Sequence, residues 1–176
     1  MGKLRVDHLE EQDEAREGEA SGASLRSVMA CFPTGVTVVA ARDASGEPIG
    51  LTVNSFTSVS LEPPLVLVCI ARGSSSHDAI IASQGFTVSV LAASQGDVAY
   101  RFAKRPSEGR FDEVNWRAAP SGHPVIEGAA GWLDCAIDEV IAAGDHSIVL
   151  GRTRACGAGN DPALVFHRGE MSSTQR

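Results

Sequence analysis

The chain has 176 residues, of which 43% are hydrophobic and 21% charged, a composition typical of one globular domain with a sizeable core. Its formal net charge is −7, from 15 Lys and Arg against 22 Asp and Glu, which argues against broad binding to nucleic acid or anionic membranes. No apolar run reaches the roughly 18–20 residues of a membrane span, and the N-terminus lacks the apolar core of a secretory signal. We therefore expect a cytoplasmic protein.

The N-terminal part divides into a polar tail and a short helix. Residues 1–22 carry seven acidic and three basic side chains and too few apolar ones to bury a face, which predicts a disordered acidic tail. From Ser24 onward, apolar residues recur every three or four positions. This spacing predicts an amphipathic helix of about two turns, which Pro33 and Gly35 end.

The rest of the chain is mainly β in character. Seven segments are rich in β-branched or continuous apolar residues, and we expect strands at 35–42, 49–61, 65–71, 86–92, 130–143, 146–156 and 163–168. Short helices are predicted at 77–83 and 94–105, with a long polar connection at 106–124. The regular alternation of a doubly wound sheet is missing. The pattern predicts a closed or semi-closed β-barrel with two or three short peripheral helices, and a frayed C-terminus at 171–176.

The sequence lacks the motifs of several common functional classes. The sequence contains no GxGxxG, P-loop or GxSxG pattern. Its four cysteines form no CxxC pair and its histidines do not cluster, so we predict neither a disulfide framework nor a metal site. A serine-rich segment runs into His77, but without an identifiable orienting acid this does not indicate a hydrolase.

Small hydroxyl and amide side chains crowd the predicted strand at 49–61. Six of them fall within nine positions: Thr52, Asn54, Ser55, Thr57, Ser58 and Ser60. A solvent-facing strand side would explain them, yet both alternating faces mix polar and apolar residues. A ligand that is partly apolar and partly hydrogen-bonding would also explain them, since an unpaired buried hydroxyl costs roughly 1–3 kcal/mol.

Two further segments each have a plain and a functional interpretation. The residues Arg72-Gly73-Ser74-Ser75-Ser76 precede a predicted helix, where serines cap the helix or present hydroxyl and N–H donors to an anion beside the arginine. The residues Gly144-Asp145-His146 are either a simple turn or a second binding segment.

These segments carry a family resemblance. The stretch from Ser24 to His167 resembles the short-chain flavin reductases, which are the reductase components of two-component flavin-dependent monooxygenases. The shared motifs, in order, are PTGV at 33–36, TVNSFTSVSLEPPLVLV at 52–68, the serine-rich loop at 74–77, FTVSVL at 86–91, RFA at 101–103 and GDHSIVLG at 144–151. Either the 52–68 or the 144–151 motif alone would be weak, whereas together they are specific.

The resemblance implies a split β-barrel of the FMN-binding type over residues 23–170, which binds flavin across a homodimer interface. It implies transfer of hydride from NADH, or NADPH, to FMN or FAD, and release of the reduced flavin to a separate monooxygenase. Such chemistry needs no metal and no protein nucleophile. The alternatives are an oxidase that retains its flavin and a non-catalytic flavin-binding module on the same barrel.

The resemblance also implies roles for individual residues. The isoalloxazine ring would lie against Thr52, Val53, Asn54 and Ser55, and the ribityl phosphate against Ser58, Arg72, Ser74, Ser75 and Ser76. His146 would be the catalytic residue and would contact the nicotinamide nucleotide, with Gly144 and Asp145 shaping its turn. Pro33 and Thr34 would lie near the same pocket.

Overall fold

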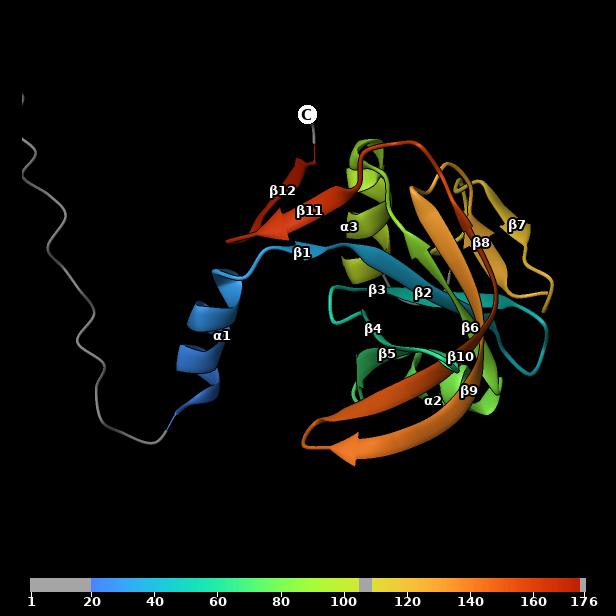
Figure 1. Cartoon of the computed structure of the whole chain (residues 1–176), viewed down its shortest axis with the longest axis horizontal. Coiled ribbons are helices and arrows are strands. Elements are labelled where there is room, and N and C mark those ends of the chain that lie inside the picture. Colours follow the sequence, from blue (N-terminus) through green and yellow to red (C-terminus); the bar gives the residue numbers. More distant parts are fainter. Residues whose placement is uncertain (1–19, 105–108, 175–176) are drawn as a thin grey trace, which may run out of the picture.

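The computed structural model describes residues 20–104 and 109–174, so most of the predicted acidic tail at 1–22 lies outside the described residues. Helix α1 spans Gly22–Ala30 and begins two residues earlier than expected. It begins there because the Ser21 hydroxyl accepts the Ser24 N–H at 3.1 Å, as an N-cap does. No residue of α1 is buried, and the helix stands apart from the body of the molecule (Figure 1).

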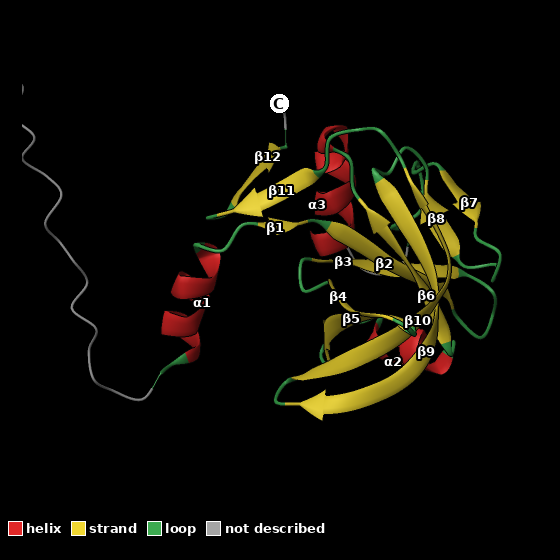
Figure 2. Ribbon diagram, viewed as in Figure 1, coloured by secondary structure: helices red, strands yellow, loops and turns green. Residues whose placement is uncertain are grey.

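The body is mainly β with a few short helices, which confirms the predicted fold class (Figure 2). The strands and helices after α1 are β1 (Thr34–Gly35), β2 (Thr37–Arg42), β3 (Pro48–Val53), β4 (Thr57–Leu61), β5 (Pro64–Ala71), α2 (His77–Ala82), β6 (Gly85–Val90), the 3₁₀ turn η1 (Ala93–Gln95), α3 (Gly96–Lys104), β7 (Trp116–Ala118), β8 (Pro124–Ile126), β9 (Gly131–Ala143), β10 (His146–Ala158), β11 (Leu164–His167) and β12 (Glu170–Ser173). Among the described residues, no helix has the length and apolar character needed to cross a membrane.

Seven strands form the main sheet, in the order β3-β2-β6-β9-β10-β5-β4. Six strand spacings would separate the edges of a flat sheet of this size by about 29 Å. The edge strands β3 and β4 follow one another in the chain, and the backbone from Val53 to Thr57 reaches at most about 14 Å. The sheet must therefore curl until its two edges approach each other.

Strand β2 separates two hydrophobic cores. Val39 and Ala41 pack into a core with Ile80 of α2, whereas Val38 and Ala40 pack into another with Phe102 of α3. Successive side chains of a strand point to opposite faces, so the continuous apolar run at 38–41 is buried on both faces. Helices α2 and α3 thus cover different faces of the same strand.

The predicted strand at 49–61 is wrong as a single element, because the chain bends between β3 and β4. At the bend, the Ser55 hydroxyl accepts the Cys69 N–H at 3.2 Å and donates to the Cys69 carbonyl at 2.9 Å. The Ser55 side chain thus makes the two hydrogen bonds to the Cys69 backbone that the backbone of a continuous strand would otherwise make. The bend sends the second half of the segment to the opposite edge of the sheet.

Three other predictions also need correction. The connection at 106–124 contains strand β7, which pairs with β8 in a small hairpin. Residues 171–173, expected to be frayed, belong to β12, because β12 pairs with β11 from Leu164↔Ser173 to His167↔Glu170. The predicted strand at 35–42 is divided, since β1 leaves the main sheet and pairs with β11. Local sequence patterns do not report these long-range pairings.

Candidate functional site

His146 stands at the first position of β10, directly after a two-residue hairpin turn. Ala143 pairs with His146 across this turn, and Gly144 has φ +58°, as the first residue of a type II′ turn requires. The residues Gly144–His146 are called the GDH turn below. Its geometry places a half-exposed imidazole at the tip of the long β9–β10 hairpin, which extends away from the body (Figure 1).

Asp145 orients the His146 ring. The His146 Nδ1 lies 2.7 Å from Asp145 Oδ1, so Nδ1 carries the hydrogen and the neutral ring keeps an acceptor at Nε2. This hydrogen bond, followed by the charge of His146, lowers the pKa of the Asp145 carboxyl below its usual range. The aspartate therefore stays ionised at neutral pH and holds one orientation of the ring.

The predicted phosphate segment lies next to the GDH turn. Residues 72–76, called the serine loop below, connect β5 to α2. At the start of the loop, the Arg72 N–H donates to the Asp145 carbonyl at 3.0 Å. At its end, His77 Nε2 lies 2.9 Å from the Ser147 hydroxyl. The structure therefore brings together two segments that are about 70 residues apart in the sequence.

Ser76 differs from the other serines of the loop because its hydroxyl is used inside the protein. This fully buried side chain donates to the Gly50 carbonyl at 3.3 Å. The Arg110 guanidinium donates to the same carbonyl at 2.5 Å and to the Ser76 hydroxyl at 3.4 Å, and burial lowers the pKa of Arg110. The accessible donors of this segment are therefore exposed Arg72, half-buried Ser74 and exposed Ser75.

Ser75 lines a cavity of about 460 Å³ whose border is acidic. Asp43, Glu47 and Asp112 lie around this cavity, together with Ile49 and Phe111. Three carboxylates repel a phosphate, so this side of the serine loop does not suit an anion. On the side that adjoins the GDH turn, the single carboxylate of Asp145 is offset by the charge of Arg72, so this side, with Ser74, suits an anion better.

The polar side chains of the 52–60 segment divide between internal and exposed positions. The Thr52 hydroxyl donates to the Ala99 carbonyl of α3 at 2.7 Å, and Ser55 bonds Cys69 as described above. Val53 is buried, whereas Asn54 and Ser58 are exposed. Part of the hydroxyl cluster is therefore explained by bonds within the protein, and Asn54, Thr57 and Ser58 are the members that face solvent.

Thr34 holds a polar atom without a partner in the part of the chain that the structure describes. Its Oγ1 is buried and makes no hydrogen bond to a described residue. Thr34 follows exposed Pro33 and pairs with Phe166 of β11. A buried unpaired hydroxyl is costly, so this position fits a site that a ligand or a second chain completes.

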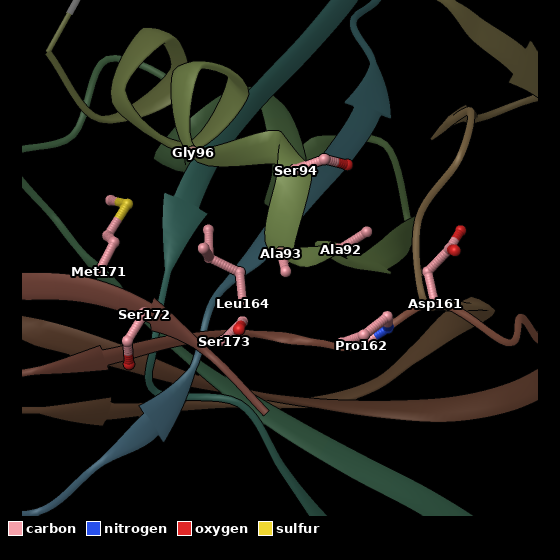
Figure 3. Close-up of a pocket in the computed structure, with 10 residues that line it drawn as sticks. All are labelled: Ala92, Ala93, Ser94, Gly96, Asp161, Pro162, Leu164, Met171, Ser172 and Ser173. Atoms are coloured by element: carbon pink, nitrogen blue, oxygen red, sulfur yellow. The ribbon is translucent and has the colours of Figure 1, made fainter. Parts of the chain in front are cut away.

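A separate cavity of about 670 Å³ lies between η1, the start of α3 and the strands β11 and β12 (Figure 3). Leu164 and Met171 line it and belong to the same small sheet as Thr34. None of the ten lining residues drawn in Figure 3 was predicted from the sequence to be a site residue. This cavity thus adjoins the β1 region without containing the predicted site residues.

Sequence reasoning missed three residues that organise the site: His77, Ser147 and Arg110. A histidine close to several serines was visible in the sequence, but its partner Ser147 lies in another motif. Arg110 was hidden in a segment predicted to be a polar connection. Among the described residues, no group of three or more His, Cys, Asp and Glu side chains is placed to hold a metal ion.

Comparison with known proteins identifies the class to which this fold and site belong. A family model described as a flavin reductase like domain matches residues 29–175. Because the match spans most of the chain, the chain belongs to that family. This confirms the resemblance seen in the 52–68 and 144–151 motifs.

Individual relatives agree with the family. The NADH-dependent FMN reductase SmoA of Agrobacterium fabrum is 41% identical over 161 residues, which cover 90% of each protein. The reductase component of a flavin-dependent trigonelline monooxygenase from Acinetobacter baylyi is 40% identical over 145 residues, covering 82% of this chain and 46% of that protein. The solved NADH:FAD oxidoreductase SgcE6 of Streptomyces globisporus is 42% identical with a TM-score of 0.80, covering 85% of this chain and 90% of that one.

Some relatives are considerably longer than the matched region. The chain spans 47%, 63% and 46% of the length of three curated relatives that it matches. The fold of this chain is that of solved flavin reductases.

Proposed function

We propose that this chain is an NAD(P)H:flavin oxidoreductase, which reduces FMN or FAD with NADH and releases the reduced flavin to a separate monooxygenase. The observation that carries the proposal is the hydrogen-bonded contact between the serine loop and the GDH turn. It brings cationic and hydroxyl donors, suited to a phosphate, next to an oriented and accessible imidazole. Both features belong to a chain of the flavin reductase like family.

The residues present fit a flavin. Arg72 and Ser74 offer a positive charge and hydrogen-bond donors for a phosphate, and exposed Asn54 offers an amide for the polar edge of a ring system. The unpaired buried hydroxyl of Thr34 fits a position that becomes complete on binding. When bound, a flavin supplies the electron-accepting chemistry, as it takes hydride from a reduced nicotinamide.

The protein's own contribution is to position the two nucleotides. Asp145 holds His146 so that its Nε2 is free to hydrogen-bond a nicotinamide nucleotide. The bond from the Arg72 N–H to the Asp145 carbonyl fixes the distance between that histidine and the serine loop. Hydride transfer requires close contact in a defined geometry and no protein nucleophile, so rigidity of this unit is its main requirement.

The proposed substrates and partner also rest on the relatives. SmoA is named an NADH-dependent FMN reductase, and SgcE6 is named an NADH:FAD oxidoreductase. The Acinetobacter relative is the reductase component of a monooxygenase. These names support NADH as the hydride donor, either flavin as acceptor and a separate oxygenase as the recipient.

A homodimer is part of the proposal, because α1 and the residues just after it expose an apolar face that no described residue covers. Leu25, Val28, Met29 and Phe32 are each between 52% and 67% exposed. Val140 and Ile141 near the tip of the β9–β10 hairpin are also exposed. A contiguous apolar surface on a globular protein marks an interaction site, and α1 leads directly into Pro33 and Thr34. A second copy that covers α1 would therefore lie beside Pro33 and Thr34.

The proposal is tested by following nicotinamide absorbance with purified protein, with NADH and NADPH each combined with no flavin, riboflavin, FMN or FAD. We expect rapid loss of NADH only when flavin is present. Because Arg72 and Ser74 offer donors to a phosphate, FMN should also have a lower KM than riboflavin, which lacks that group. His146→Ala should lower kcat/KM for NADH by about tenfold, as loss of a hydrogen bond to a bound ligand does.

The control for that substitution is His123→Gln, which alters a half-buried histidine in the connection between β7 and β8. These two strands lie on the opposite side of the body from α1 (Figure 1). We expect this variant to have the same kcat/KM for NADH as the unchanged chain. Tight flavin binding without turnover would instead support the non-catalytic module. Flavin that stays bound through purification and turns over without added flavin would support the oxidase.

A further inference from the structure

The two ends of the serine loop are bonded to the two neighbours of His146. Arg72, the first residue of the loop, donates its N–H to the Asp145 carbonyl at 3.0 Å. His77, just after the loop, contacts the Ser147 hydroxyl at 2.9 Å through Nε2. Asp145 and Ser147 flank His146, so the serine loop is attached to the GDH turn on both sides.

The His77 contact has the properties of a fixed connection. His77 and Ser147 are both buried, at 9% and 5% exposure, so water competes little for this hydrogen bond. Asp78 Oδ1 lies 2.7 Å from His77 Nδ1, which assigns the ring hydrogen to Nδ1 and leaves Nε2 to accept the Ser147 hydroxyl. Two fixed partners leave the imidazole a single orientation.

Ser147 and His146 have different surroundings although they are adjacent. Successive strand residues point to opposite faces, so the buried Ser147 faces α2 while the half-exposed His146 faces away from it. His77 therefore acts on His146 only through the backbone of β10. A shift of the serine loop would move this backbone, and with it the imidazole.

We propose that His77 is a positioning residue that couples flavin binding at the serine loop to nicotinamide binding at His146. This inference rests on the proposed function, because it takes the serine loop as the flavin phosphate site and His146 as the nicotinamide contact. Flavin that orders the serine loop also orders the GDH turn through the His77–Ser147 bond. Each ligand then binds more tightly when the other is present, and by the same factor in both directions.

The coupling is measured with oxidised ligands, which bind without reacting. The Kd of FMN is determined by flavin fluorescence, alone and with saturating NAD⁺, and the ratio of the two Kd values is the coupling factor. We expect a factor of about two to ten in the unchanged chain, the range that one internal hydrogen bond supports. Ser147→Ala removes the hydroxyl that donates to His77 Nε2, so the coupling factor should fall close to one.

Two substitutions of His77 separate its two hydrogen bonds. His77→Asn keeps a donor near the Nδ1 position and loses Nε2, so the coupling factor should also fall close to one. His77→Gln reaches the Nε2 position with its amide and should retain most of the coupling. The double variant His77→Asn with Ser147→Ala should behave as either single variant does, because both remove the same bond.

A matched control is Ser89→Ala, which removes another buried strand hydroxyl. Ser89 accepts the Ile126 N–H at 3.0 Å in β6, so this variant loses a comparable bond away from the serine loop. We expect it to keep the coupling factor of the unchanged chain, even where its stability is lower. A purely structural role of His77 would lower stability and leave the ratio of Kd values unaltered.

The outcomes separate this inference from the proposed function. If the unchanged chain oxidises NADH with flavin but Ser147→Ala and His77→Asn keep its coupling factor, the inference is overturned and the proposed function stands. An unchanged chain that is active but shows a factor of one also overturns the inference alone. If the unchanged chain binds no flavin, both are overturned.

Discussion

Two histidines at the site are held in the same way by the residue next to them. His77 Nδ1 and His146 Nδ1 each lie 2.7 Å from a carboxylate oxygen of the adjacent aspartate, Asp78 and Asp145 respectively. Each pair directs Nε2 away from the acid. Burial then decides the role, because Nε2 of His77 meets Ser147 inside the protein while His146 is half-exposed and available to a ligand.

Burial also governs the chemistry of Cys135 on β9. Removal from water raises the pKa of its thiol from 9.0 to about 11, because the thiolate is poorly solvated there. Between those pH values the unfolded chain loses this proton and the folded chain keeps it. The contribution to stability is thus fully present below pH 9 and is lost as the pH rises through about 11.

We expect the free energy of unfolding to fall by about 2–3 kcal/mol between pH 9 and 11 on account of this group. In Cys135→Ala, this part of the alkaline decline should be absent, although the smaller side chain lowers stability at every pH. Urea unfolding of both chains at several alkaline pH values measures the difference. Parallel pH curves for the two chains would contradict the argument.

At the scale of elements, glycines at two hairpin turns carry the positive φ angles that their strands need. Gly144 has φ +58° in the GDH turn, and Gly46 has φ +88° in the turn between β2 and β3. A Cβ atom at either position would meet nothing within 4 Å. Substitution by alanine therefore introduces backbone strain without a side-chain clash.

Gly144→Ala and Gly46→Ala should each lower the free energy of unfolding by about 1–2 kcal/mol, the cost of a left-handed conformation for an L-residue. Only Gly144→Ala should also raise the KM for NADH, because it displaces the turn that carries His146. Chemical unfolding and steady-state kinetics on both variants test this. An equal change of KM in the two variants would show that strain, rather than the position of His146, affects activity.

Element prediction succeeded where the pattern was local. The helix at α2 and the strands β5, β6, β9 and β10 follow from apolar runs bounded by turn residues. The break between β3 and β4 was missed because it depends on Ser55 bonding to Cys69, a residue on another strand. Strand β12 was missed because its residues are polar and gain order only by pairing with β11.

For the molecule as a whole, the exposed apolar face of α1 is the surface that the proposed homodimer would cover. Val28 is 67% exposed and lies on this face, whereas Ser27 lies on the opposite side of the same helix. In the single chain neither residue is buried, so substitutions here should not affect folding of the body.

Val28→Glu should raise the dissociation constant of the proposed homodimer by about tenfold or more, because burial of a valine is worth about 1.5–3 kcal/mol and a charge opposes it. Ser27→Glu introduces the same charge on the other face and should leave the dissociation constant nearly unaltered. Sedimentation equilibrium of both variants and the unchanged chain gives these constants. If all three chains are monomeric at the same concentrations, the homodimer is excluded.

The mainly β class, most of the strands and the two motifs that indicate a flavin reductase could all be predicted from the amino-acid sequence. This was possible because strand periodicity, turn glycines and short motifs are all patterns of residues that are close together in the sequence. Only the tertiary structure decided that the serine loop is attached to the GDH turn, that Ser76 and Arg110 share the Gly50 carbonyl, and that β3 and β4 lie at opposite edges of the sheet. These features depend on contacts between segments that are distant in the sequence, and a local sequence pattern does not specify which distant segment it will contact.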